Sequence, residues 1–224
     1  MSISSALADP VLVQLGPLPL TQQVVTTWAL MAVLAGSCAL LTRRMHLSPG
    51  RVQVLLEALV LGIEQQLREV IRRDPAPFMP LLASLFLFIV AASLATLIPG
   101  VHAPTAHLET PAALALVVFV SVHAYGIAAQ GLGRYLRGYL EPTPFMLPLN
   151  VLSELTRTFS LMVRLLGNML SHEIVIAVIV TLAGLLVPIP FMLLGVLIGI
   201  IQAFIFTMLA SVFIGAAIGA IERG

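Results

Sequence analysis

Residues 146–186, MLPLNVLSELTRTFSLMVRLLGNMLSHEIVIAVIVTLAGLL, decide the fold of this chain. The stretch is mostly apolar, and as one helix rising about 1.5 Å per residue it would be about 60 Å long. Residues 190–221 would form a second helix of about 48 Å. Both exceed the hydrocarbon core of a bilayer, which is about 30 Å thick. We therefore predict a hairpin of two long, steeply tilted membrane helices, joined by a turn at Val187-Pro188-Ile189-Pro190.

The composition of the whole chain excludes an ordinary soluble domain. Of its 224 residues, 59% are hydrophobic and 9% are charged, whereas a soluble domain carries about 25% charged residues. A net charge of +1 provides no basic surface for nucleic acid. The single cysteine excludes a disulfide framework and a thiolate zinc site. We predict an all-α integral membrane protein.

Three further stretches, 22–42, 78–99 and 111–131, are long and apolar enough to span a membrane. With the long pair they give about five membrane helices in a single membrane domain covering residues 1–224. Segment 51–73 has apolar residues at helical spacing opposed by charged ones, which predicts an amphipathic helix on the cytoplasmic membrane face. A hairpin that dips into the membrane is the alternative for this segment.

The distribution of arginine predicts the orientation, since the chain has no lysine. Residues 1–21, 99–110 and 187–190 contain no Lys or Arg. No basic residue precedes the first span, so we expect no cleaved signal peptide. By the positive-inside rule, the N-terminus is outside and the C-terminus is cytoplasmic. The arginines expected on the cytoplasmic side are Arg43, Arg44, Arg51, Arg68, Arg72, Arg73, Arg134, Arg137 and Arg223.

The first long helix carries polar residues that a membrane helix normally excludes. Charged groups at this depth mark an ion path or a binding site by default. Glu154 and Arg157 are three residues apart, so a local ion pair is one interpretation of them. Arg164 has no acidic residue three or four positions away, and snorkelling to the membrane surface is the alternative for its side chain. The full set is Asn150, Glu154, Arg157, Ser160, Arg164, Asn168, His172 and Glu173.

Helical geometry separates these polar residues into two groups. Ser160, Arg164 and Asn168 follow one another at intervals of four and share one stripe of the helix. Glu173 lies about 180° around the helix from Arg164 and about 13 Å further outward, with His172 beside it. This arrangement favours two separate aqueous pockets over a single binding site. A polar network between helices, without a transport role, is the alternative.

The last helix has one strongly polar residue inside its apolar run, Gln202. Its amide is a candidate hydrogen-bond partner for the guanidinium of Arg164, or a simple link between helices. Four glycines, Gly195, Gly199, Gly215 and Gly219, recur at intervals of four and predict close helix packing.

The loop before the third predicted span contains His102, His107 and Glu109. We expect Glu109 or His107 to line an outer vestibule of the ion path. Their spacing is not typical of a metal site, and we expect neither a bound metal nor a cofactor.

The string Ser160-Leu-Met-Val-Arg164-Leu-Leu-Gly167-Asn168-Met169, followed by Glu173, closely resembles the signature of subunit a of rotary, F-type ATP synthases. The run Gln202-Ala-Phe-Ile-Phe206 matches the motif that this family carries on its last helix. The close match covers roughly residues 145–215, while the first half is similar in layout only. The resemblance is compatible with the bacterial N-type branch, some members of which are coupled to sodium.

The resemblance implies a role for each matching residue. Arg164 would be the stator arginine that faces a rotating c-ring, and Asn168, Glu173 and Gln202 would line the ion path. Glu154 would lie near its cytoplasmic opening. One position departs from the family pattern: some members have a small residue just before the acidic residue and a histidine on the last helix. Here these positions hold His172 and Gly195, so the opposite helix would supply the imidazole.

The resemblance therefore implies a non-catalytic subunit for ATP synthesis and proton transport, with sodium as the other candidate ion. It would supply two offset half-channels and the arginine that couple ion flow to rotation. Its partners would be the c-ring, the peripheral-stalk b subunits and the lipid bilayer of a bacterial inner membrane. A stand-alone ion channel or transporter is the alternative, but the sequence lacks the internal repeats of such proteins. A membrane scaffold would not need charged residues in apolar helices.

Overall fold

The computed structural model describes residues 11–15, 18–42, 51–71, 74–97, 107–140, 143–184 and 187–219. Most of the arginines used for the orientation lie outside these ranges, as does His102. The described chain is helical apart from one short antiparallel hairpin, β1 (Val11–Leu15) and β2 (Leu18–Thr21), which precedes the first helix. The hairpin was not predicted. The predicted all-α membrane fold is confirmed.

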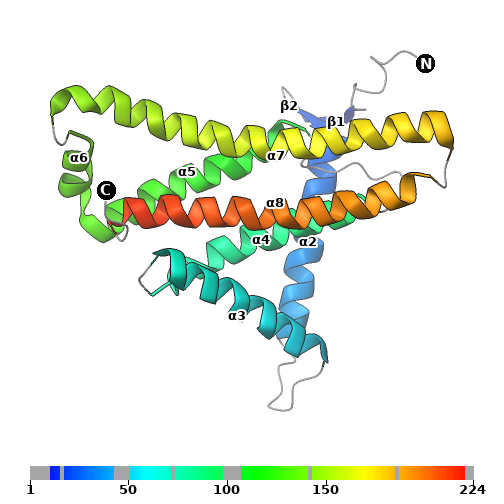
Figure 1. The fold of residues 1–224 in the computed structure, drawn as a ribbon, viewed down its shortest axis with the longest axis horizontal. Helices are drawn as coiled ribbons and strands as arrows, with labels where there is room; N and C mark the ends of the chain where they lie inside the picture. Colours follow the sequence, from blue (N-terminus) through cyan, green and yellow to red (C-terminus); the bar gives the residue numbers. More distant parts are fainter. Residues whose placement is uncertain are drawn as a thin grey trace.

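The helices follow the predicted stretches closely. The three expected spans form α2 (Gln22–Thr42), α4 (Met79–Ala95) and α5 (Glu109–Gln130). The amphipathic segment forms α3 (Arg51–Ile71). The long pair forms α7 (Leu147–Ala183) and α8 (Pro188–Ala217), which lie side by side (Figure 1). Two short elements, α6 (Leu132–Leu140) and the 3₁₀ turn η2 (Pro144–Met146), connect α5 to α7.

The turn between α7 and α8 lies slightly earlier than predicted. Gly184, with a φ of 76°, ends α7 in a conformation that favours glycine. The helix α8 already begins at Pro188, so the prediction of a turn over residues 187–190 was wrong. Pro188 and Pro190 lie in the first turn of α8, where a backbone N–H has no partner within the helix and proline is therefore tolerated.

Helix α8 is the centre of the bundle, because α3, α4, α5 and α7 all pack against it. Small residues permit this close packing. A side chain added at Gly195 would overlap His172 of α7, and one added at Gly199 would overlap Ser93 of α4. Close packing at these two glycines is therefore confirmed. Gly219 lies beyond the helix with a φ of 70°, so it belongs to the end of α8 and not to its packing face.

One face of α3 belongs to the protein core. Ile63, Leu67 and Ile71 are buried in the same core cluster as residues of α4 and α8. On the exposed side, Arg68 forms an ion pair with Glu64, with an N–O distance of 2.7 Å. The hydrogen bond from Arg68 to Glu64 raises the pKa of the guanidinium. The segment is one continuous helix and not a hairpin.

The sequence did not predict helix α6. Its nine residues, two of them arginines, were interpreted as part of the loop between the third span and the long pair. Gly131, with a φ of 79°, turns the chain between α5 and α6. Tyr135 of α6 is then buried against Gly126 of α5, where the missing side chain makes room for the phenol ring. The packing of the Tyr135 ring against α5 therefore holds this short helix in place.

The outer surface of the bundle is apolar. Exposed fractions reach 69% at Val33, 89% at Phe145 and 82% at Leu182, which a water-soluble protein of this size rarely shows over so many helices. Among the described residues, α5, residues 147–182 of α7, and α8 are each long and apolar enough to cross a membrane. Two shorter apolar helices, Val24–Leu40 and Met79–Ala95, accompany them.

We expect Leu67→Ala to destabilise the bundle, because Leu67 is fully buried on the core-facing side of α3. Truncating a buried leucine costs about 2–5 kcal/mol. Leu61→Ala is the matched control on the same helix, since Leu61 is 62% exposed. Thermal unfolding of the purified protein in detergent should show a lower Tm for Leu67→Ala than for Leu61→Ala. Equal Tm values would contradict the packing of α3.

Candidate functional site

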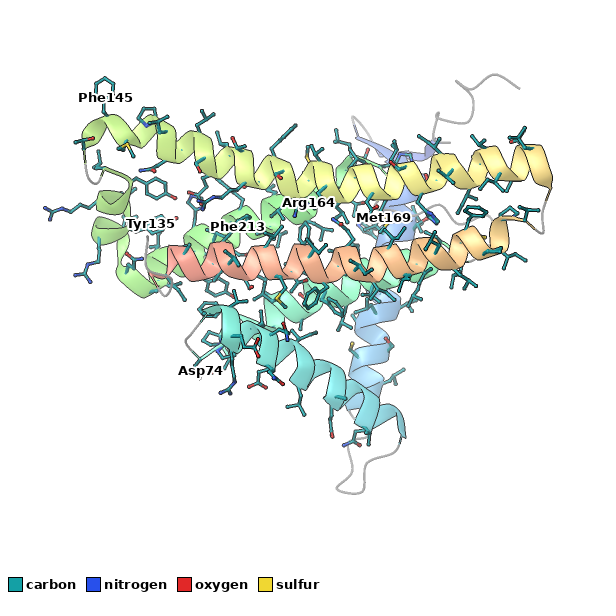
Figure 2. The ribbon with its side chains drawn as sticks, in the orientation of Figure 1. Asp74, Tyr135, Phe145, Arg164, Met169 and Phe213 are labelled. Atoms are coloured by element: carbon teal, nitrogen blue, oxygen red, sulfur yellow. The ribbon has the colours of Figure 1, made fainter. Side chains whose placement is uncertain are left out.

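Arg164 lies at the middle of α7 and is exposed along a groove between α7 and α8 (Figure 2). The groove has a volume of ≈ 500 Å³. Within the part of the chain that the structure describes, no carboxylate forms an ion pair with Arg164. The guanidinium therefore faces out of the subunit with its charge uncompensated. The groove is lined by Leu149, Leu152, Ser153, Thr156, Arg157, Ser160, Leu161, Arg164, Leu209 and Phe213.

No hydrogen bond joins Gln202 to Arg164, which was one of the two interpretations of this amide. It is 5% exposed and points into the bundle, and its Nε2 atom has no hydrogen-bond partner among the described residues. The hydroxyl of Thr207, on the same helix, is also buried without a partner. Asn168, the third member of the Arg164 stripe, is partly buried.

The side chain of His172 occupies the space next to Gly195 of α8. A Cβ atom at Gly195 would overlap the imidazole ring, so the ring fits there only because the residue on α8 is glycine. This contact supports the expectation that α7 supplies the imidazole at this position. The Nε2 atom of His172 is buried without a hydrogen-bond partner in the described chain. The neighbouring Glu173 is partly buried.

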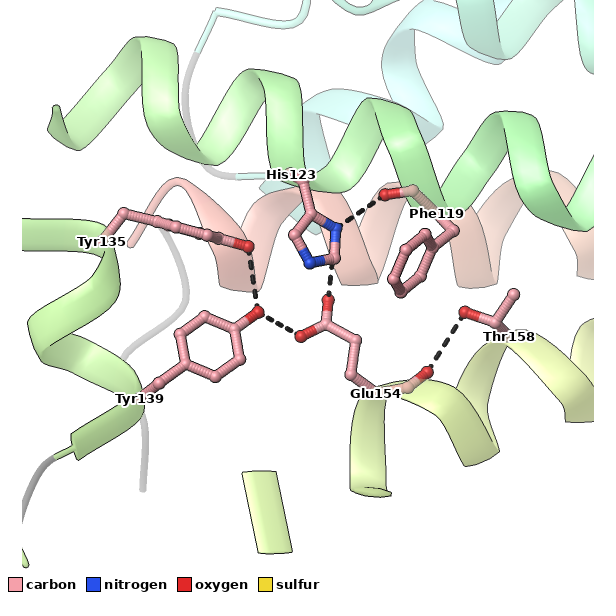
Figure 3. Close-up of polar contacts among 6 residues, drawn as sticks. All are labelled: Phe119, His123, Tyr135, Tyr139, Glu154 and Thr158. Atoms are coloured by element: carbon pink, nitrogen blue, oxygen red, sulfur yellow. Dashed lines mark hydrogen bonds and ion pairs between the residues drawn. The ribbon is translucent and has the colours of Figure 1, made fainter. Parts of the chain in front are cut away.

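A second polar cluster surrounds Glu154, near the end of the bundle where α6 lies, which we call the α6 end (Figure 3). The hydroxyl of Tyr139 donates to Oε2 of Glu154. The hydroxyl of Tyr135 lies 3.0 Å from that of Tyr139. On the other side of the carboxylate, Nδ1 of His123 lies 3.9 Å from Oε1. Helices α5, α6 and α7 each contribute to this cluster.

Tyr139 also links α6 to the start of α7. Its backbone carbonyl accepts a hydrogen bond of 2.9 Å from Nδ2 of Asn150. Burial, followed by the hydrogen bond to Glu154, raises the pKa of the Tyr139 phenol well above its usual range. The phenol therefore stays neutral and remains a hydrogen-bond donor to the carboxylate.

The interpretation of Glu154 and Arg157 as a local ion pair was wrong. The carboxylate of Glu154 turns toward α5 and α6, where Tyr139 and His123 contact it. The guanidinium of Arg157 instead lies over the ring of Phe213 in α8, 5.5 Å from the ring centroid. Such a cation–π contact stabilises an arginine without a counter-charge.

The residues expected at an outer vestibule lie at the start of α5. Glu109 is exposed in the first turn of this helix, and His107 is partly buried just before it. His123 is almost four helical turns further along α5 and belongs to the Glu154 cluster instead. Within the described ranges, no three His, Cys, Asp or Glu residues come together in a way that could hold a metal ion.

Sequence reasoning did not find His123, Tyr135 and Tyr139 as partners of Glu154. The spacing of Tyr135 and Tyr139, four residues apart in the short α6, is the one signal that could have suggested a shared face. The pairing of α5, α6 and α7 that brings them to Glu154 is a tertiary contact.

Fold and site together define a class: a multi-pass helical membrane protein whose longest helix pair carries charged and polar groups at several depths. Comparison with known sequences narrows this class. The ATP synthase A chain family matches residues 24–215. The chain belongs to this family, the F-type ATP synthase subunit a, and is a non-catalytic subunit of the membrane sector.

Curated relatives extend over nearly the whole chain. ATP synthase subunit a 2 of Bradyrhizobium sp. (strain BTAi1) is 53% identical over 221 residues, 99% of both chains. ATP synthase subunit a 1 of Hahella chejuensis is 42% identical, covering 96% of this chain and 92% of its own. ATP synthase subunit a 1 of Chlorobaculum tepidum is 47% identical, covering 93% and 96%.

We expect Gly195→Ala to destabilise the contact between α7 and α8, because the new methyl group overlaps the ring of His172. Overpacking a filled site costs about 1–3 kcal/mol. Gly36→Ala in α2 is the matched control, since its added Cβ meets nothing within 4 Å. The double variant Gly195→Ala with His172→Gly should recover the Tm that Gly195→Ala loses. An unchanged Tm in Gly195→Ala alone would contradict the contact.

Proposed function

We propose that this chain is the stator ion-channel subunit of its ATP synthase. It supplies two offset half-channels, and Arg164 between them couples proton translocation to rotation of the c-ring. The observation that carries this proposal is the exposed guanidinium of Arg164 in an apolar helix, beside a groove and without an ion-pair partner among the described residues. A charge in this position is costly unless a partner outside the subunit compensates it. A rotor carboxylate is a partner of the required sign.

Electrostatics explains how such a pair produces coupling. A rotor carboxyl must be neutral to face lipid, because burying its charge costs several kcal/mol. Opposite Arg164 it can ionise, since a nearby guanidinium favours the charged form. Arginine does not lose its proton at accessible pH, so it separates the half-channels without conducting protons itself. A membrane potential supplies about 2.3 kcal/mol per charge per 100 mV.

Two polar regions support the separation into half-channels. His172, Asn168, Glu173 and Gln202 would line the outer one, with Glu109 or His107 near its mouth. The buried nitrogens of His172 and Gln202, which have no partner among the described residues, would each bind a water molecule in this half-channel. Glu154 lies near the inner opening, and Ser160 shares the groove with Arg164.

Several buried apolar side chains lie between the two regions. Leu161 and Leu165 of α7 lie between Glu154 and His172 along the helix, and are 2% and 0% exposed. On α8, Phe206 lies between Gly195 and Phe213 and is 0% exposed, beside the buried hydroxyls of Thr207 and Ser211. In this proposal the apolar side chains interrupt a direct polar route, so an ion leaves the outer region and travels with the rotor.

The surroundings of the subunit follow from the same proposal. The positive-inside rule places the N-terminus outside and the α6 end on the cytoplasmic side of a bacterial inner membrane. The c-ring and the peripheral-stalk b subunits are the expected partners. The proton is the transported ion in this proposal, and sodium is the other candidate.

We expect Arg164→Ala to abolish proton-coupled ATP synthesis while the complex still assembles, because the side chain is exposed and forms no ion pair among the described residues. Arg164→Lys should be severely impaired, since a compact ammonium can lose its proton in an apolar setting and lacks the planar guanidinium group with its several N–H donors. The measurement is ATP synthesis in energised membrane vesicles, with co-purification of the c-ring as the assembly control. Substantial coupled synthesis in Arg164→Ala would disprove the proposal.

We also expect residues 172 and 173 to be reached by water from the outside only. Single cysteines replace His172 or Glu173 in a Cys38→Ser background, which removes the native thiol. A membrane-impermeant thiol reagent added outside should label both positions, and the same reagent added to inverted vesicles should not. Labelling from the cytoplasmic side alone would place these residues in the inner half-channel and contradict the assignment.

A further inference from the structure

Arg157 and Arg164 line the same groove from the same side of α7. Seven residues separate them, which is about 20° short of two full helical turns and places Arg157 about 10 Å nearer the α6 end. Arg157 is exposed, as Arg164 is. Among the described residues, no carboxylate belongs to the lining of this groove. The groove therefore holds two positive charges, and the mechanism proposed above uses only one of them.

The fold leaves the charge of Arg157 uncompensated. Glu154 lies three residues earlier, but its carboxylate contacts Tyr139 and lies near His123 instead. In the part of the chain that the structure describes, Arg157 forms no ion pair. Its guanidinium lies over the ring of Phe213, 5.5 Å from the ring centroid. An aromatic ring carries no net charge, so this contact holds the cation in place without neutralising it.

Phe213 also places this charge at the boundary between two hollows. The second hollow has a volume of ≈ 220 Å³, and its lining shares Ser153, Arg157 and Phe213 with that of the groove. The stack of Arg157 on Phe213 is therefore part of the wall between the two hollows. The second hollow extends toward the α6 end, because Tyr135 and Tyr139 of α6 line it. A proton that leaves the groove for the cytoplasmic side would pass Arg157.

We propose that Arg157, held on the ring of Phe213, is a second positive charge that promotes the loss of the proton from the rotor carboxyl on the cytoplasmic side of Arg164. This inference rests on the proposed function and adds two residues to it. Arg157 acts on the rotor carboxyl through its electric field. Phe213 is a positioning residue, because it acts through Arg157.

The step needs no further reactant. The O–H bond of the rotor carboxylic acid breaks, and the proton passes to a water molecule in the second hollow. The carboxylate that remains is favoured by both guanidiniums, which keep their own protons throughout. A unit charge about 10 Å away changes the proton affinity of a carboxylate about tenfold, at an effective dielectric constant of about 20. The second hollow has room for water, since a water molecule occupies about 30 Å³ in the liquid.

Other charged and titratable groups lie around this boundary, and they stay the same in the variants that test Arg157. Helix α8 contributes only apolar side chains to the described linings of the two hollows. A difference between variants that depends on the charge at residue 157 therefore comes from this residue. The surrounding groups are Arg164 and Glu154 of α7, Tyr135 and Tyr139 of α6, and His123 of α5 beside Glu154.

The deciding variant is Arg157→Gln, which keeps a polar side chain and removes the charge. Passive proton conduction toward the cytoplasmic side is measured at a fixed membrane potential, in inverted vesicles stripped of the soluble ATPase head, while the cytoplasmic pH is varied. Without the charge the rotor carboxyl holds its proton more tightly, so conduction requires a higher pH. We expect the midpoint of the pH profile to rise by about one unit in Arg157→Gln. Arg157→Lys, which keeps the charge, should have a midpoint close to that of the wild type.

Phe213→Leu tests the positioning role. Leucine keeps an apolar side chain but offers no ring face to the guanidinium, so we expect a smaller shift of the midpoint in the same direction. Phe213→Tyr, which keeps the ring face, should retain the midpoint of the wild type. Arg134→Gln is the matched control, because Arg134 is an exposed cation of α6 that lines neither hollow. Its midpoint should not move.

A purely structural role of Arg157 predicts a different result. Conduction per assembled subunit, quantified by immunoblot, would fall by one factor at every pH, and the midpoint would stay in place. An unshifted midpoint in Arg157→Gln overturns the inference, as does an equal shift in Arg134→Gln. Where Arg157→Gln does not assemble, the midpoint of Phe213→Leu decides in its place.

The failure of this inference is distinguishable from that of the proposed function. An unshifted midpoint in Arg157→Gln leaves the proposed function standing as long as Arg164→Ala abolishes coupled synthesis. Coupled synthesis in Arg164→Ala removes the proposed function itself, whatever the pH profile of the Arg157 variants.

Discussion

A guanidinium placed in the middle of an apolar helix is the constraint on which the arrangement of this protein depends. Arg164 cannot be neutralised by losing its proton, and no described carboxylate compensates it. The helix therefore has to present Arg164 on its outer face. The bundle packs the opposite side of α7, where Leu161, Leu165 and Met169 are buried. One charged residue thus sets which face of α7 belongs to the core and which remains for a partner.

The small residues of α8 make this arrangement possible. Because Gly195, Gly199, Ala203 and Ala210 carry little or no side chain, four other helices approach the same central helix closely. Polar groups of neighbouring helices, such as the imidazole of His172 and the hydroxyl of Ser93, are pressed against its backbone. The apolar side chains of Phe206 and Leu165 are fully buried along the helix pair, between the levels of His172 and Glu154.

The two ends of the helix pair differ in their chemistry. The Nε2 atom of His172 and that of Gln202, two turns along α8 from Gly195, have no partner among the described residues, which suits a region that exchanges water. Around Glu154 the carboxylate contacts a phenol and lies near an imidazole, and a second phenol lies within hydrogen-bonding distance of the first. This end has more polar contacts because α6 packs onto α5 and contributes both tyrosines. An asymmetry of this kind fits a path in which ions are gathered at one end and released at the other.

The sequence by itself determined the membrane class, the helix positions, the long pair and the presence of a charge, Arg164, inside an apolar run, because hydropathy over 20 residues and a charge within it are local properties. Helical periodicity also placed Arg164 and Glu173 on opposite sides of the long helix. The partners of each polar group were decided only by the tertiary structure. Glu154 and Arg157 are near neighbours in sequence, yet Glu154 turns to Tyr139 and Arg157 to Phe213. A helix fixes only the direction of a side chain, and the helices that pack there decide what it contacts.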